Sequence, residues 1–121
     1  MNSNKAYDIM DLIAIKNTVS PGDTNILIRL SHHNDSEIRA YAAELLVLAS
    51  GAEAESTLTS LTDDNDEAVR VNACDSLSAF PTVNTYKKLY ESAVNDSSPL
   101  VRKFALLSLA DIMNNINADK G

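Results

Sequence analysis

A twelve-residue segment that occurs three times constrains the fold of this chain more than any other feature. The middle copy, D-E-A-V-R-V-N-A-C-D-S-L, runs from Asp66 to Leu77. The other two are D-S-E-I-R-A-Y-A-A-E-L-L, from Asp35 to Leu46, and S-P-L-V-R-K-F-A-L-L-S-L, from Ser98 to Leu109. The three align without a gap, and their arginines lie 31 and 32 residues apart. A fixed period of this size indicates stacked supersecondary units, because no single unit buries its apolar face alone.

Each copy has a branched aliphatic residue directly before the arginine, an alanine three residues after it and a leucine seven residues after it. The copies are Ile38, Arg39, Ala42 and Leu46; Val69, Arg70, Ala73 and Leu77; and Val101, Arg102, Ala105 and Leu109. The pattern D-x-x-V-R-x-x-A-x-x-x-L resembles the second helix of HEAT repeats, over about residues 20–115. The resemblance implies an all-α fold, an α-α superhelix of about seven helices whose second helices line the concave face. It is weak evidence for any activity, because solenoids host many functions.

The chain is expected to form a single domain over residues 1–121. Its predicted parts are a capping helix at 5–19, repeats at about 20–49, 50–80 and 81–115, and a polar tail at 116–121. The poverty of Gly and Pro, three of each, suits such a helical chain.

The predicted helix boundaries follow from capping residues. The second helices should begin near Ser36, Glu67 and Pro99, after Asp35, Asp66 and Ser98. A capping box from Ser50 to Glu53 is expected to start the first helix of the middle repeat. The polar residues from Asn114 to Gly121 are expected to fray.

The formal charge of −7 is unevenly distributed. Residues 51–80 hold seven acidic residues and one basic residue, a net charge of −6, whereas residues 81–121 carry +1. An acidic middle disfavours nucleic acid, whose phosphates need Lys and Arg, and favours a basic protein partner. The alternative is that these acids only keep a small protein soluble. The absence of a signal peptide or membrane-spanning stretch and the single cysteine predict a cytoplasmic protein.

The repeated arginines are expected to have a structural role. In HEAT repeats this arginine typically bonds acidic residues in the turns of its own or a neighbouring repeat, and a guanidinium fork matches a carboxylate. Six residues before the second and third arginines stand Asp64 and Asp96; His33 has that place before the first, so Asp35 is the expected substitute. The predicted structural residues are Arg39, Arg70, Arg102, Asp35, Asp64, Asp66 and Asp96. The alternative is a ligand site at the arginines.

No residue pattern indicates a metal site. His32 and His33 are adjacent, so they diverge on a helix, and no spaced His or Cys completes a zinc site. Cys74 aligns with Ala43 and Leu106, which predicts burial between helices and an inert thiol.

No motif for catalysis is present either. The chain lacks a Gly-rich phosphate loop, G-x-S-x-G and H-E-x-x-H. Some HEAT-like proteins are bilin lyases, but the chain shares only the repeat with them. DNA glycosylases built of related repeats need a basic groove and aromatic residues, and this chain has no Trp and an excess of acids. We therefore expect no enzymatic activity, no cofactor and no metal.

The outward ridge of the second helices is the expected binding surface. Positions one, two, five and nine residues after each arginine should lie there, with Glu37 and Glu67 at its mouth. The predicted partner-binding residues are Glu37, Tyr41, Glu44, Glu67, Asn72, Asp75, Lys103, Phe104, Leu107 and Asp111. Aromatic anchors within a charged surround suit protein binding. The alternative is that Tyr41 and Phe104 pack against neighbouring helices.

Two functional classes remain. The first is an acidic immunity or antitoxin-type inhibitor that binds and neutralises a basic protein such as a nuclease toxin, an analogy from size, charge and fold. The second is a scaffold or adaptor in a larger assembly. An uncapped, apolar last helix would point to the second class. No nucleic-acid or membrane partner is expected, and the oligomeric state is left open.

Overall fold

The computed structural model describes residue 10 and residues 23–120, with side chains as far as residue 116. Over these residues the chain forms six α-helices and no strand. They are α2 (Asp23–Leu30), α3 (Ser36–Leu45), α4 (Ala52–Leu61), α5 (Glu67–Ser76), α6 (Val83–Asn95) and α7 (Pro99–Lys120), with the 3-10 turns η1 (Leu46–Leu48) and η2 (Leu77–Ala79). The all-α prediction is confirmed, and the predicted capping helix at 5–19 lies outside the described residues.

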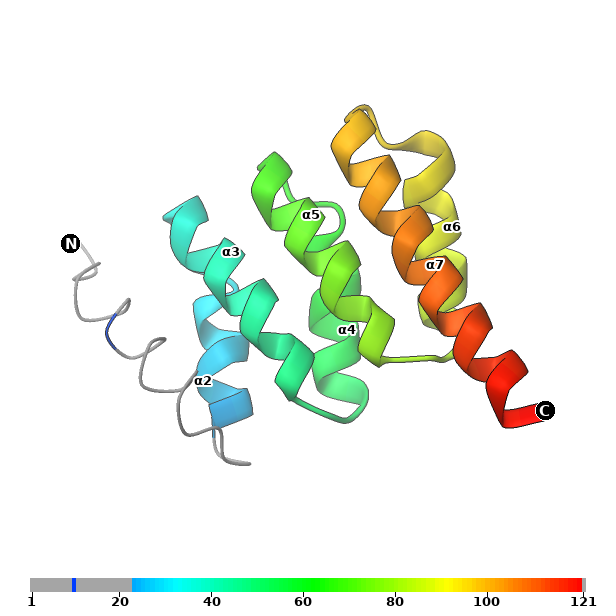
Figure 1. Cartoon of the computed structure of the whole chain (residues 1–121). Coiled ribbons are helices and arrows are strands. Elements are labelled where there is room, and N and C mark those ends of the chain that lie inside the picture. The colour runs from blue at the N-terminus through cyan, green and yellow to red at the C-terminus, as the bar shows by residue number, and fades with distance from the viewer. Residues whose placement is uncertain (1–9, 11–22, 121) are drawn as a thin grey trace.

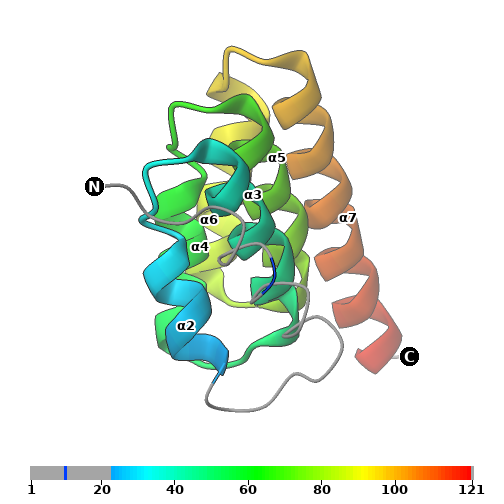
Figure 2. The same cartoon turned by 90° about the vertical axis from the view of Figure 1, so that its left-hand side faces the viewer.

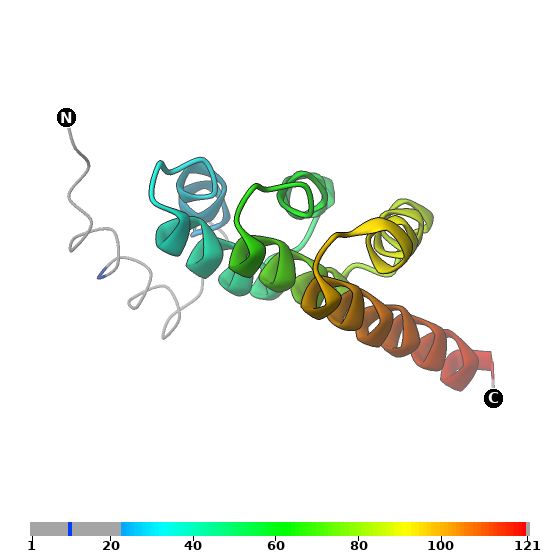
Figure 3. The ribbon, with the colours of Figure 1, turned by 90° about the horizontal axis from the view of Figure 1, so that it is seen from above.

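The helices form three antiparallel pairs that stack side by side (Figure 1). The first helices of the pairs, α2, α4 and α6, make one layer, and the second helices, α3, α5 and α7, make the other (Figures 2 and 3). The second helices pack extensively on one another, whereas the first helices contact one another little. This unequal packing makes the second-helix layer the inner side of the curve.

The predicted starts of the second helices are confirmed, and side-chain caps explain them. An oxygen of Asp35 accepts a hydrogen bond from the Glu37 N–H, and an oxygen of Asp66 accepts one from Val69 N–H. Ser98 Oγ accepts the Val101 N–H at 3.2 Å at the start of α7. Each cap satisfies a backbone donor that the first turn of a helix leaves open.

The predicted capping box at Ser50 is wrong. The residue at the N-terminal boundary of α4 is Gly51, whose φ of 99° only glycine adopts readily, and no side chain caps it. A side-chain Cβ at this position would meet nothing within 4 Å, so the backbone angle is what requires glycine. The chain therefore turns from η1 into α4 through a backbone conformation, not through a serine cap.

The repeated positions form the core between the two layers. The branched aliphatic residue, the alanine and the leucine of each copy are buried in all three repeats. Leucines at one position of the first helices, Leu27, Leu58 and Leu89, are at most 1% exposed and fill the space beneath them. The small alanine lets helices approach closely, and the leucines supply most of the apolar area removed from water.

The predicted frayed tail is wrong for residues 114–120, because α7 continues to Lys120. No Pro or Gly interrupts the sequence between Pro99 and Gly121, so nothing in the backbone ends the helix earlier. Ile112, which is 2% exposed, anchors the later turns to the core. In the part of the chain that the structure describes, no helix combines the length and apolar character needed to cross a bilayer.

Candidate functional site

Two of the repeated arginines reach into the loop of the following repeat. Arg39 donates from Nε and Nη2 to the carboxylate oxygens of Asp64, at 2.9 and 3.0 Å. Arg70 forms the same fork with Asp96, at 3.0 and 3.3 Å. The arginine side chains are 15% exposed and the carboxylates 12% and 9%, so both ion pairs are largely shielded from water. These forks tie each repeat to its successor.

The remaining guanidinium nitrogen, Nη1, holds the turn of the arginine's own repeat. The acceptor is always the carbonyl six residues before the arginine: His33 for Arg39, Asp64 for Arg70 and Asp96 for Arg102, at 2.9, 3.0 and 2.7 Å. Among the described residues, no carboxylate lies within ion-pair distance of Arg102. Its side chain therefore holds only its own turn.

The carboxylates thus face the arginine of the preceding repeat. Asp64 lies six residues before Arg70, but its side chain forms the fork with Arg39. Asp35, the expected substitute partner of Arg39, caps α3 through its bond from the Glu37 N–H. A sequence cannot distinguish these pairings, because the choice depends on how neighbouring repeats are placed.

Charge and hydrogen bonding keep the Arg39–Asp64 pair ionised. Burial by itself raises the pKa of Asp64, but the bonds from the Arg39 guanidinium and the Asp66 N–H, with the nearby arginine charges, lower the pKa below its usual value. The bond to Asp64 in turn raises the pKa of Arg39, although burial opposes it. The pair is therefore a structural tie and not a proton donor or acceptor near neutral pH.

Hydrogen bonds from polar side chains also connect the second helices to one another. Ser76 Oγ donates to the Ala43 carbonyl and Ser108 Oγ to the Cys74 carbonyl, both at 2.7 Å. Neither serine was predicted to have a role, although both lie six residues after their arginine and this shared position was a usable signal.

Two predicted partner-binding residues also form hydrogen bonds between repeats. Asn72 is half-buried and donates from Nδ2 to the Ala40 carbonyl at 2.9 Å. The Glu67 carboxylate accepts a hydrogen bond from Ser98 Oγ. Asn72 therefore connects α5 to α3 of the preceding repeat, and Glu67 connects α5 to the start of α7 in the next repeat.

Most of the other predicted partner-binding residues lie on the solvent-exposed side of the second-helix layer. We define the second-helix surface by its exposed members: Glu37, Tyr41, Glu44, Asp75, Lys103, Leu107 and Asp111. The position five residues after the arginine, occupied by Glu44, Asp75 and Leu107, is exposed in every repeat. Phe104 differs, because it is half-buried and packs against the core. Tyr41 is 43% exposed and does not pack against the core, so its ring remains available as an aromatic anchor.

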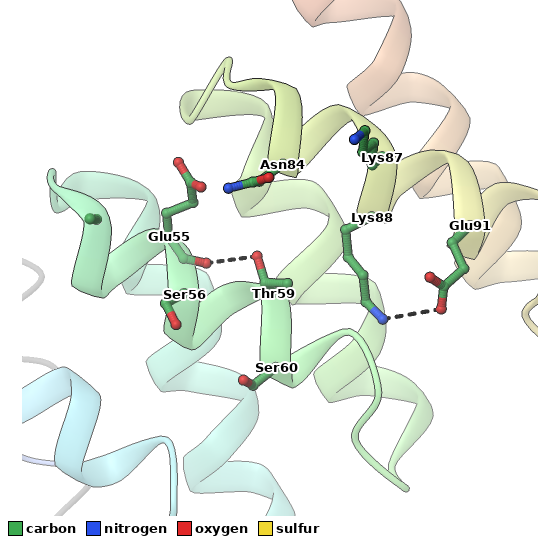
Figure 4. Close-up of a pocket in the computed structure, with 9 residues that line it drawn as sticks. Glu55, Ser56, Thr59, Ser60, Asn84, Lys87, Lys88 and Glu91 are labelled. Atoms are coloured by element: carbon green, nitrogen blue, oxygen red, sulfur yellow. Dashed lines mark hydrogen bonds and ion pairs between the residues drawn. The ribbon is translucent and has the colours of Figure 1, made fainter.

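A groove on the opposite side runs between α4 and α6 (Figure 4). Lys88 reaches down into it, and its Nζ lies 2.7 Å from Asp63 and 3.2 Å from Glu91. Burial lowers the pKa of Lys88, but bonds and charges from the two carboxylates outweigh burial and raise it. A lysine that stays protonated is a poor nucleophile, so it holds the two helices together rather than offering reactive chemistry.

Metal-binding geometry is likewise absent from the described residues, where no group of three His, Cys, Asp or Glu side chains could hold an ion. His33 uses Nδ1 to accept the Asp35 N–H at 2.9 Å, in the turn before α3.

Cys74 is fully buried, and burial raises the pKa of its thiol to about 11. At pH 8 the thiol is almost wholly protonated, and only the thiolate reacts readily. We expect a soluble disulfide reagent to leave Cys74 unmodified in the native protein and to label it rapidly in urea, as followed by absorbance of the released thiolate. Rapid labelling without urea would contradict this burial.

The geometry agrees with the comparison to known families. The family model for HEAT repeats matches residues 24–110. A search of curated proteins found no match to the chain. HEAT repeats generally mediate protein–protein interactions and are typically non-catalytic scaffolds. Because the match spans most of the chain and all the described helix pairs, the protein belongs to the HEAT repeat family.

Proposed function

We propose that this chain is a non-enzymatic protein-binding module that takes a basic protein partner on the second-helix surface. The observation that carries the proposal is the exposure of Glu44 and Asp75 at one repeat position on adjacent helices. Tyr41 and Leu107, 43% and 50% exposed, supply aromatic and aliphatic anchors on the same surface. Acids around apolar anchors recognise a surface of Lys, Arg and apolar side chains.

The rigidity of this surface supports the same proposal. The forks to Asp64 and Asp96 and the bonds from Ser76 and Ser108 fix the spacing of the second helices. Charges held on rigid helices lose little backbone freedom when a partner binds, so more of the contact energy appears as affinity.

The acids of the surface provide the direct test. Glu44→Ala with Asp75→Ala should weaken binding of the basic partner at least about 30-fold, because charge pairs partly removed from water are costly to break. Glu53→Ala with Glu55→Ala is the matched control, since it removes the same charge from α4 in the other layer, and should change the affinity by less than about threefold. Titration calorimetry gives both values. Equal losses in the two double variants would contradict the location of the site.

Salt should act mainly on association. Raising the ionic strength screens the field that steers a basic partner, so the association rate constant should fall while dissociation changes less. An acidic or neutral partner, or association indifferent to salt, would refute the charge argument.

The narrower form of the proposal is that the partner is a basic nuclease toxin, and that the chain is its cytoplasmic inhibitor. It rests on the negative charge, the HEAT repeat fold and the absence of catalytic groups among the described residues. Mixing the purified partner with this chain and assaying nuclease activity tests it: complete inhibition at one equivalent is expected, and unchanged activity in the complex would replace the inhibitor with a scaffold.

A specific observation favours the scaffold alternative. The outer side of the last helix pair exposes apolar residues, among them Tyr90 on α6 and Leu106 on α7. Such a side suits a unit that adds to an assembly.

A further inference from the structure

The last of the repeated arginines does not use two of the nitrogens that the other two arginines use. Arg39 and Arg70 donate from Nε and Nη2 to a carboxylate in the loop of the following repeat. Arg102 donates only from Nη1, to the carbonyl in its own turn, and no carboxylate among the described residues lies within ion-pair distance of it. Its Nε and Nη2 therefore have no acceptor in the described part of the chain, at the end of the stack where a following repeat would lie.

An exposed leucine lies beside this arginine. Leu106 comes one helical turn after Arg102, on the same face of α7, and is 57% exposed. Ala43 and Cys74 occupy this position in the preceding repeats, and both are fully buried. The expected burial therefore fails at Leu106, because no described repeat covers it.

The helix α6 adds apolar side chains at the same end of the stack. Its residues Tyr86 and Tyr90 are 40% and 58% exposed. Counting back 31 residues gives Glu55 and Thr59 of α4, which line the groove between α4 and α6. The positions that face the next repeat are thus polar in α4 and aromatic in α6. Exposed apolar groups gathered on one side of a small protein mark an interaction site. We define the end face as Arg102, Leu106, Tyr86 and Tyr90.

The path of α7 leaves the end face open. Leu109 aligns with Leu46 and Leu77, where the 3-10 turns η1 and η2 begin and the chain turns into the next helix pair. The helix α7 instead runs on past Leu109 to Lys120 without a turn (Figure 1). Within the described residues no further helix pair folds back onto α7, so a cover for the end face has to come from outside them.

The two forks within the stack define the chemistry of the acceptor that Arg102 lacks. Asp64 and Asp96 each accept the backbone N–H two residues later, at 2.9 Å, so the turn itself holds the carboxylate toward the arginine. The matching occupant is therefore a helix pair with an aspartate in the turn before its second helix. A second copy of this chain does not match, because its first repeat has His33 in that place. His33 Nδ1 accepts the corresponding N–H, that of Asp35, but an imidazole has no pair of oxygens to receive the fork.

We propose that the end face binds a helix pair of a different protein. The aspartate in the turn of that pair accepts Nε and Nη2 of Arg102, and its second helix packs on Leu106. The contact repeats the one that Arg39 makes with Asp64 inside the stack. The inference goes beyond the proposed function and gives the scaffold alternative a partner of defined chemistry. It does not depend on the basic partner, because the acids of the second-helix surface take no part in it.

A peptide with the sequence of residues 62–77 is the probe, because it contains Asp64, its turn and the helix that packs on α3. Titrated into the isotopically labelled full chain, it should shift the Nε–H signal of Arg102 and the amide signals of α7 in two-dimensional NMR. The peptide with Asp64→Asn should bind at least about tenfold more weakly, because the fork loses its charged acceptor. Asp63→Asn is the matched control, since it removes the same charge from a carboxylate outside the fork, and should change the affinity by less than about threefold.

Variants of the full chain complete the test. Arg102→Ala should bind the unchanged peptide and its Asp64→Asn form equally, whereas Lys103→Ala, which removes the neighbouring charge, should keep the tenfold preference. Circular dichroism melts show that both variants are folded. An Arg102 signal that does not move at millimolar peptide, or a preference that survives Arg102→Ala, would overturn the proposal. So would a dimer of the full chain in sedimentation equilibrium that Tyr90→Glu dissociates, because a second copy would then cover the end face.

Discussion

Replacing Arg70 by alanine is expected to lower the free energy of unfolding by about 3 kcal/mol, the low end of the range for breaking a largely buried ion pair. The Asp96 carboxylate would lose both bonds from the guanidinium while remaining 9% exposed. The Asp64 carbonyl would lose its bond from Nη1 as well. Urea unfolding followed by circular dichroism measures the change.

Arg102→Ala is the matched control, because it removes the same side chain from the same repeat position. Arg102 bonds only the Asp96 carbonyl among the described residues, so its loss should cost about 1 kcal/mol. Equal losses in the two variants would show that the fork to the next repeat contributes nothing beyond the turn. No loss in Arg70→Ala would show that the Asp96 carboxylate reaches water without its partner.

The contrast between the two arginines marks the limit of what the sequence predicts. Helix starts at Ser36, Glu67 and Pro99 were predictable because the caps lie directly before them, and capping is local chemistry. The carboxylate that pairs with each arginine was not predictable. Arg39 and Asp64 lie 25 positions apart in the sequence, and Arg70 and Asp96 lie 26 apart. That separation follows from the placement of one repeat on another.

The second-helix surface could likewise be predicted from the sequence only in part. Helical periodicity correctly predicts that Glu44, Asp75 and Leu107 are exposed, because the arginine anchors the face of each helix. It does not predict that Asn72 bonds a neighbouring carbonyl or that Phe104 packs on the core. Leu106 shows the opposite case, since its alignment with Cys74 predicts burial and its place in the last repeat exposes it.

The second large effect is expected at the centre of the stack. Leu58 lies on α4 in the middle pair and is fully buried. Leu58→Ala should lower the free energy of unfolding by about 3 kcal/mol, because the lost methyl groups leave a cavity that surrounding helices close only in part. The free energy of unfolding of a domain of this size is about 5–15 kcal/mol, so the variant should melt at a clearly lower temperature than the wild type.

Leu107→Ala makes the same chemical change on the second-helix surface, where Leu107 is 50% exposed, and should cost less than about 0.5 kcal/mol. The comparison separates packing from helix propensity, because both residues lie within helices and leucine-to-alanine favours the helix slightly in each. Among the described helices, those of the middle pair contact both the first and the third pair, so a cavity in the middle pair weakens the stack on both sides. If Leu58→Ala and Leu107→Ala melted at the same temperature, packing in the core between the two layers would not be what holds the second-helix surface in place.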